Sequence, residues 1–332
     1  MPLALVLVLL LIVGGAGIAA TAAYFELKPA PVPPGSISLT DDEGRTVAAP
    51  SNPHRVVVLA PSILDTMVRL GLRDRVVGVD CGPTGLGTDY NGSQIANWSL
   101  TSSICVGTYP SLNIPQLLNA SPQLVLASTI VSLSDVEELS STYHLPVLVL
   151  QPATLGGITV DVNLLAEIFP VSSAADALVG QLQKVLGNAQ VIQANLTNSG
   201  ASLPTVLVTY YAVPASSPDP GYWSYGPGTF GESLIEFVGA SSISASSQLP
   251  YPVLSGPQVL LANPSVIIYG TGFGVDLSEY QQGPDWSSLG AVTGGHAWGV
   301  DGNLLTEPDP TMILDGIPIL FGLIHPGLYP PA

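Results

Sequence analysis

Residues 112–128 read LNIPQLLNASPQLVLAS, and residues 254–270 repeat the phrase as LSGPQVLLANPSVIIYG. The two 17-residue stretches share Leu, Pro, Gln, Leu, Ala and Pro at the same six positions. In each, one proline stands where a helix begins, a second ends that helix, and an apolar run typical of a buried strand follows. Any α/β protein contains such units, but one that recurs about 140 residues later favours two similar lobes with a ligand site between them.

The rest of the chain fits this organisation. Strand-like and helix-like segments alternate in both halves, which favours parallel sheets. The first lobe is expected over residues 37–170 and the second over residues 200–332. Between them, residues 171–199 have apolar residues at helical spacing and are expected to form one long connecting helix. The predicted fold class is therefore α/β, with two Rossmann-like lobes, mostly parallel sheets and one linking α-helix.

The N-terminus indicates export. Residues 3–25 are 23 residues without a charge, enough to span a bilayer as a hydrophobic helix. The same stretch contains Ala20-Thr21-Ala22, a cleavage pattern of signal peptides. Residues 1–25 are thus either a transmembrane anchor or a signal peptide, and residues 26–36 a Pro-rich linker. Under both alternatives the remainder is extracytoplasmic, either anchored to the cell membrane by the N-terminal helix or secreted.

Export sets expectations for covalent modification. A disulfide between Cys81 and Cys105, the chain's two cysteines, is the expected pairing in an oxidising compartment; two free buried thiols are the alternative. Asn91, Asn97 and Asn195 open Asn-x-Ser/Thr tripeptides and are candidate glycosylation sites.

The charge distribution excludes several partners. Only 9% of residues are charged, the net charge is −17, and the last of the seven Lys and Arg is Lys184. Because phosphate binding needs clustered cations, nucleic acid is excluded as a partner, and the C-terminal half cannot dock on an anionic membrane surface. A chain with few ion pairs loses little when its carboxylates take up protons, so an acidic medium is a further hypothesis.

Aromatic residues gather before the helix expected at residues 233–238. Tyr210, Tyr211, Tyr222, Trp223 and Tyr225 lie within sixteen residues that Pro and Gly interrupt. A loop of this kind favours an aromatic wall for a bulky ligand, and a folded-over surface loop is the alternative. Further rings that other loops could add are Tyr109, Trp286 and Trp298.

No motif in the chain predicts chemistry. Gly226, Gly228 and Gly231 spell G-x-G-x-x-G, but a dinucleotide site needs that motif directly after a strand. The four histidines are scattered, so neither a metal site nor a cofactor is predicted. Glu307 and Asp309 form a close carboxylate pair, which turns at Pro308 and Pro310 explain as well as catalysis does. No nucleophile–base pair can be named, and an enzyme is not expected.

Several segments, in this order and spacing, resemble one known family. They are His54–Asp80, Val106–Asn113, the repeated phrase, Gly226–Ala240, Pro250–Ile268 and Trp286–Val292. The chain is similar to the substrate-binding proteins of ABC importers for cobalamin, ferric siderophores and haem. The resemblance implies an extracytoplasmic solute receptor that binds a small molecule in a largely preformed interlobe cleft and performs no bond chemistry. The positions that match the family's cleft are Pro61, Ser62, Tyr109, Ser128, Thr129, Tyr222, Trp223 and Tyr225.

The chain departs from that family in two ways. Family members carry a glutamate at the start of each repeat helix to dock on the permease, whereas this chain has Pro115 and Pro257 there. An arginine that grips anionic ligands is replaced by Thr311. We therefore expect a neutral or cationic ligand, or an iron complex held by tyrosines and backbone donors. The alternative is a cell-surface structural or adhesive protein that kept the fold but not the permease docking.

Overall fold

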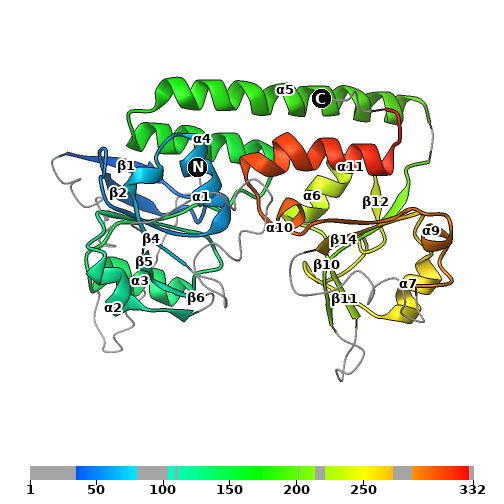
Figure 1. The fold of residues 1–332 in the computed structure, drawn as a ribbon, viewed down its shortest axis with the longest axis horizontal. Coiled ribbons are helices and arrows are strands. Elements are labelled where there is room, and N and C mark those ends of the chain that lie inside the picture. Colours follow the sequence, from blue (N-terminus) through cyan, green and yellow to red (C-terminus); the bar gives the residue numbers. More distant parts are fainter. Residues whose placement is uncertain are drawn as a thin grey trace, which may run out of the picture. The chain divides into compact units, whose positions relative to one another are not determined.

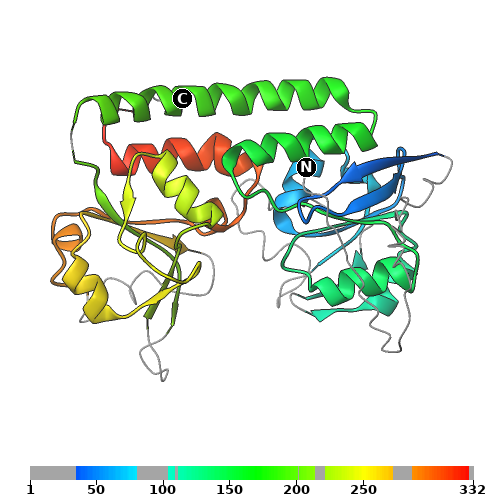
Figure 2. The same cartoon turned by 180° about the vertical axis from the view of Figure 1, so that it is seen from behind.

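Two sheets, each in its own lobe, are linked by one helix, α5 (Ser172–Asn198). This computed structural model of the 332-residue chain describes residues 35–80, 104–108, 111–200, 202–213, 221–271 and 286–328. Figures 1 and 2 show α5 running along both lobes. The predicted α/β class, with two lobes, mostly parallel sheets and a long linking helix, is confirmed.

The sheet of the first lobe is parallel throughout, in the order β5-β4-β3-β8-β9. Its strands are β3 (Val56–Leu59), β4 (Val76–Val79), β5 (Ile104–Cys105), β8 (Leu124–Ala127) and β9 (Val147–Val149). The central strands are apolar and buried along their whole length because helices cover both faces of a parallel sheet. The helices are α1 (Pro61–Arg69), η1 (Arg73–Arg75), α2 (Ile114–Asn119), α3 (Leu133–Ser141) and α4 (Leu155–Ile168). Two antiparallel hairpins complete the lobe: β1 (Ser36–Thr40) with β2 (Thr46–Pro50), and β6 (Gly107–Thr108) with β7 (Ser111–Leu112).

The second sheet is mixed, in the order β13-β11-β10-β14-β15, with β12 also pairing β10. Its strands are β10 (Thr205–Val213), β11 (Gly221–Ser224), β12 (Ser241–Ser242), β13 (Val253–Leu254), β14 (Val266–Thr271) and β15 (Ala297–Asp301). Strands β12, β14 and β15 continue the parallel pattern, whereas β11 and β13 run antiparallel. The helices are α6 (Phe230–Phe237), α7 (Gly256–Ala262), α9 (Gly290–Thr293), α10 (Asn303–Thr306), the π-helical segment η2 (Met312–Gly316) and α11 (Ile317–Ile324).

The repeated phrase forms the same unit in both lobes, as predicted: α2 leads into β8, and α7 leads into β14. The caps differ. The side chain of Asn113 accepts a hydrogen bond from Gln116 N at 3.0 Å to start α2. A capping box starts α7, in which the amide of Ser255 donates to Oε1 of Gln258 at 2.8 Å. Each cap satisfies helix N–H groups that would otherwise lack partners.

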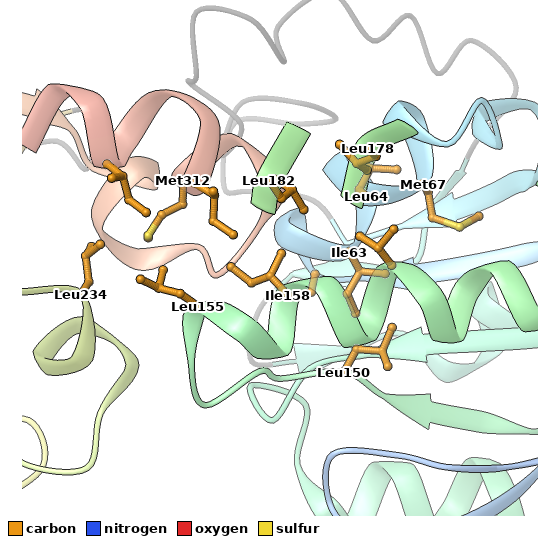
Figure 3. Packing of buried hydrophobic residues seen from close by; sticks show 14 of the residues in the cluster. Ile63, Leu64, Met67, Leu150, Leu155, Ile158, Leu178, Leu182, Leu234 and Met312 are labelled. Atoms are coloured by element: carbon orange, nitrogen blue, oxygen red, sulfur yellow. The ribbon is translucent and has the colours of Figure 1, made fainter. Parts of the chain in front are cut away.

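One hydrophobic cluster continues from the first lobe into the second. Helix α5 packs against α4 of the first lobe and against α6, η2 and α11 of the second. Figure 3 shows side chains from both lobes meeting in this cluster, with Leu178 and Leu182 of α5 among them. The others that it labels are Ile63, Leu64, Met67, Leu150, Leu155, Ile158, Leu234 and Met312. A shared close-packed core resists hinging, because each lobe would lose apolar contacts if it moved.

The structure corrects one local expectation. Tyr222 and Trp223, expected in a loop, lie in a strand, β11. Two helices have a proline in their first turn: α1 begins at Pro61 after Ala60, and α11 follows η2 directly.

The expected N-terminal segments, residues 1–25 and most of 26–36, lie outside the described residues. Among the helices of the described part of the chain, none combines the length and the apolar character that crossing a membrane requires.

Candidate functional site

The first lobe has a topological switch point between β3 and β8. The chain leaves β3 through α1 toward β4 on one side, and β8 lies on the other side of β3. In open α/β sheets, ligands bind outside the carboxyl ends of strands at such a point. The predicted residues Pro61, Ser62, Ser128 and Thr129 follow these two strands directly.

These four residues differ in their exposure to solvent. Thr129 is exposed and Pro61 half-buried, whereas Ser62 and Ser128 are buried. The hydroxyl of Ser128 accepts a hydrogen bond from Ile130 N at 3.4 Å, which turns the chain as it leaves β8. Ile130 itself is 42% exposed, and it adds an apolar surface that the sequence pattern did not single out.

A carboxylate from the second lobe reaches this strand end. Oε2 of Glu307 accepts a hydrogen bond from the backbone N–H of Ser62 at 3.2 Å. Burial and, to a smaller extent, the nearby Asp80 after β4 raise the pKa of Glu307 to about 7, although hydrogen bonding with Ser62 opposes the rise. Glu307 therefore has a structural partner beyond the turn at Pro308, which sequence reasoning did not find because the two residues are far apart in the chain.

A second contact joins the lobes along α1. Both carboxylate oxygens of the buried Asp65 accept from Arg69 Nε, at 3.0 and 2.8 Å. Oδ2 of Asp65 also accepts from the backbone N–H and the hydroxyl of Thr311, at 3.2 and 3.0 Å. Arg69 Nη2 in turn donates to the Thr311 hydroxyl at 2.6 Å. Thr311, where the family's ligand-gripping arginine was expected, thus holds a first-lobe ion pair.

The second lobe has its own switch point, between β10 and β14. Strand β10 pairs β12 on one side and β14 on the other, and the chain visits β12 before β14. Tyr210 and Tyr211 stand near the end of β10, and Tyr211 is 41% exposed. Tyr211 lies opposite Trp223 of the neighbouring β11. Two of the predicted aromatic residues therefore meet at the strand ends where a ligand is expected.

Two other predicted rings are packed inside the lobe. Tyr225 is 5% exposed and Trp286 is fully buried, each in a hydrophobic cluster. The hydroxyl of Tyr225 donates to the carbonyl oxygen of Leu305 at 2.6 Å. Neither ring presents a face to a ligand, because their apolar surfaces are already covered by protein. The expectation of an aromatic wall that includes them is corrected on this point.

The remaining predicted rings are half-buried. Tyr222 points to the same face as Trp286, with ring centroids 5.1 Å apart, so it belongs to a core. Trp298 packs on the hydrophobic cluster and lies in the first half of the edge strand β15, away from its carboxyl end. Trp223 lies 6.5 Å from Tyr210 between ring centroids. Of these three rings, Trp223 has the position that best fits a ligand contact.

The three glycines of the G-x-G-x-x-G motif are explained by packing and backbone conformation. A Cβ on Gly231 would lie 2.2 Å from the ring of Tyr225, and a Cβ on Gly226 would lie 2.2 Å from the carbonyl oxygen of Leu249. Gly228 has a φ of +81°, in the region that favours glycine. The motif therefore lets α6 approach Tyr225 closely.

Some predicted residues lie outside the described part of the chain: Tyr109, Cys81, Asn91 and Asn97. Cys105 is a half-buried residue of β5, and its pairing with Cys81 stays a prediction. Asn195 is exposed on α5. Within the described ranges, no three His, Cys, Asp or Glu side chains converge in a way that could hold a metal ion.

The two positions at which the family resemblance implies docking glutamates are exposed. Pro115 and Pro257 occupy the first turns of α2 and α7, where a proline's missing N–H costs no helical hydrogen bond. The exposed surface of α7 also includes Leu261, which is 89% exposed. Both helix starts thus carry a proline where the family resemblance implies a carboxylate, and α7 exposes a further apolar side chain near its end.

Comparisons with known proteins agree with the fold. The chain is 22% identical over 296 residues to the ABC transporter substrate-binding lipoprotein YvrC of Bacillus subtilis, which covers 88% of this chain and 87% of that protein. It is 28% identical over 237 residues to a cobalamin-binding protein of Halobacterium salinarum, covering 69% of this chain and 57% of that protein. The solved structure of the molybdate periplasmic binding protein MolA of Haemophilus influenzae superposes with a TM-score of 0.74 at 19% identity, covering 88% of this chain and 92% of MolA.

A family model covers most of both lobes. The model of the periplasmic binding proteins matches residues 56–297, from the start of β3 to the start of β15. That range includes both sheets' central strands, both repeat units and the connecting helix. This chain therefore belongs to the periplasmic binding protein family.

Proposed function

We propose that the chain is the extracytoplasmic solute-binding receptor of an ABC importer and that it holds a bulky iron complex or a cobalamin-like ligand between its lobes. One observation carries the proposal: each lobe has a topological switch point, and predicted ligand residues follow the strands at both. Ser128 and Thr129 follow β8, and Tyr211 lies near the end of β10 with Trp223 opposite it on β11. The family membership and the names of the relatives support the same reading.

The charge of the molecule limits the ligand. No Lys or Arg follows Lys184 in the sequence, so the second lobe offers an anion no side-chain cation. The polar groups that reach the first-lobe strand end include the carboxylates of Glu307 and Asp80. An oxyanion would meet repulsion there, whereas a neutral or cationic complex would not. We therefore propose a ligand unlike the molybdate of MolA, even though the two folds are alike.

The proposed contacts follow from exposure and position. Thr129 and Pro61 would offer polar and apolar contacts from the first lobe, and Tyr211 and Trp223 would stack on the ligand from the second. Ser62, Ser128 and Tyr222 would act behind them by fixing the loops, because their side chains are largely covered. Tyr109 keeps its predicted role. Because the lobes share one hydrophobic cluster, binding would be mainly preformed.

The receptor is proposed to bind and release its ligand without transforming it. The family consists of binding proteins. The described carboxyls near the strand ends are engaged in hydrogen bonds with backbone and hydroxyl groups, as Glu307 and Asp65 are. We propose that residues 1–25 either anchor the receptor to the outer face of the cell membrane or direct its secretion as a signal peptide.

Docking to a permease would have to differ from the docking that the family resemblance implies. With Pro115 and Pro257 at the docking positions, an arginine on a permease would find no carboxylate there. Contact would instead be apolar, through the exposed α7 surface that includes Leu261. The same loss of carboxylates motivates the alternative, a cell-surface structural or adhesive protein that kept the binding-protein fold.

Native mass spectrometry of the full chain, purified from its own cells, tests the proposal. We expect one small molecule per chain, which is lost when the protein is denatured. If no adduct is found in the cells' protein and none forms with cobalamin, a ferric hydroxamate or haem, the receptor proposal fails. Long assemblies in electron micrographs of the same preparation would favour the structural alternative.

A further inference from the structure

Carboxyl groups make most of the polar contacts where α1 meets residues 307–311. Glu307 accepts from Ser62 N at 3.2 Å, and Asp65 accepts from Thr311 N and its hydroxyl, at 3.2 and 3.0 Å. Asp309 accepts from Met312 N at 2.7 Å. Asp65 is 2% exposed and Asp309 3% exposed. We call this region the interlobe contact.

Acids from both lobes face this contact. Asp65 of α1 and Asp80 at the end of β4 come from the first lobe, while Glu307 and Asp309 come from the second; Tyr225 also faces Glu307. The cation that acts on Asp65 and Asp309 is Arg69. The undescribed residues between positions 35 and 332 contain no Lys or Arg, so no cation can come from them.

An independent observation in α4 also favours protonated carboxyl groups near the interlobe contact. Asp161 is 7% exposed, and its Oδ1 atom has no hydrogen-bond partner. It lines a small cavity together with Ser62, Thr66 and Pro308, directly beside the interlobe contact. A charged carboxylate without a partner is costly in such a place, whereas a protonated one carries no net charge. The nearby Asp42 adds a further like charge.

We propose that the interlobe contact is proton-dependent: it holds the lobes together when the carboxyl groups of Glu307 and Asp309 carry protons and loosens when these two become charged. A neutral carboxyl keeps an acceptor oxygen for the N–H groups of Ser62 and Met312. A charged one adds repulsion among Asp65, Asp309 and Glu307 that Arg69 offsets only in part. The fold would therefore suit an acidic medium.

The direction of the pH effect follows from linkage. Burial raises the pKa of Glu307 to about 7 and that of Asp161 to about 8. Burial, with Asp65 as a neighbouring charge, raises the pKa of Asp309 well above its ordinary value. The folded state thus binds more protons than the unfolded state, whose carboxyls have pKa values of about 4. The stabilisation is fully present below about pH 4 and is lost as the pH rises through about 7 to 8.

The test is the urea midpoint of the full chain between about pH 5 and about pH 9, together with its radius of gyration by small-angle scattering. We expect the midpoint of the wild type to fall and its radius to grow as the pH rises. The Glu307→Gln and Asp309→Asn variants keep the shape and an acceptor oxygen but cannot ionise, so each should flatten both changes. Glu137→Gln, at an exposed position on α3, is the matched control and should behave as the wild type does.

Two results would overturn the proposal. One is a urea midpoint of the wild type that stays constant or rises over this pH range. This result can be obtained from the wild type alone, so it does not depend on whether the variants fold. The other is that both variants, shown by circular dichroism to be folded, have urea midpoints and radii of gyration that change with pH as much as those of the Glu137→Gln control. Neither result bears on ligand binding, since the measurements are made without ligand.

Discussion

The guanidinium of Arg69 in the first lobe donates to the hydroxyl of Thr311 in the second at 2.6 Å. The same arginine pairs with Asp65, whose side chain is 2% exposed. We predict that Arg69→Leu lowers the free energy of unfolding by about 3 kcal/mol, because it leaves Asp65 buried without its cation. Urea unfolding at neutral pH measures this loss. Adding Asp65→Asn to Arg69→Leu should restore part of it, and a double variant no more stable than the single one would contradict the explanation.

Tyr225 provides a test of its assignment to the core. The Gly231→Ala variant brings a methyl group within 2.2 Å of that ring, so we expect a loss of about 2–4 kcal/mol. Thermal unfolding measures it. Gly322→Ala, in a helix where a Cβ meets nothing within 4 Å, is the control and should be neutral or stabilising. A Gly231→Ala protein as stable as the wild type would mean that the ring moves freely, as a ligand-facing ring could.

The connecting helix can be made stiffer. Gly180 and Gly187 lie within α5, and a Cβ at either meets nothing within 4 Å. Replacing each with alanine should raise the free energy of unfolding by about 0.5–1 kcal/mol, since alanine loses less backbone entropy in a helix. If the ligand site is preformed, the variant that carries both alanines should bind ligand with unchanged affinity. A marked drop in affinity would instead show that α5 must bend.

Trp223 is the ring on which ligand affinity should depend most. We expect Trp223→Ala to weaken binding about tenfold to a hundredfold, the effect of removing an aromatic contact worth about 1.5–3 kcal/mol. Trp298→Ala is the matched control, because that ring is also half-buried but lies away from the strand ends. The control should lower stability without changing affinity. Titration of both variants with ligand, followed by fluorescence, measures the two affinities. Weakened binding in Trp298→Ala with unchanged binding in Trp223→Ala would instead place the site at β15.

The ionisation of Asp161 should make the free energy of unfolding depend on pH. Burial and the charge of Asp42 raise its pKa to about 8, so the folded state holds a proton that the unfolded state releases above about pH 4. We predict that Asp161→Asn differs little from the wild type near pH 4 and becomes more stable than it, by about 5 kcal/mol, near pH 9, because a rise of about four pKa units corresponds to that free energy. Chemical denaturation at both pH values measures the difference. A difference independent of pH would show that Asp161 does not hold the proton.

The features that local sequence determines could be predicted. Proline and apolar spacing located α2, β8, α7 and β14, because the prolines and the buried strands act within a few residues. The long helix α5 followed from its periodicity alone. The predicted residues Ser128 and Thr129 directly follow β8 at the switch point of the first sheet, which is where ligands of open α/β sheets bind.

What the sequence could not provide was contact between distant residues. The aromatic residues were taken together as one wall, but the pleat of β11 directs Tyr222 and Trp223 to opposite faces, and Gly231 lets the helix cover Tyr225. The pair Glu307 and Ser62 joins residues 245 positions apart, and no local pattern signals it. Tyr211 was among the predicted aromatic residues, and it lies exposed near the end of β10.

Isothermal titration of the full chain with cyanocobalamin, a ferric hydroxamate, haem and molybdate tests the central claim most directly. We predict saturable binding of one molecule per chain for one of the three bulky ligands, with a Kd of about 1 μM or tighter, and no heat with molybdate. Folded protein that gives no saturable heat with any of the three bulky ligands would contradict the account.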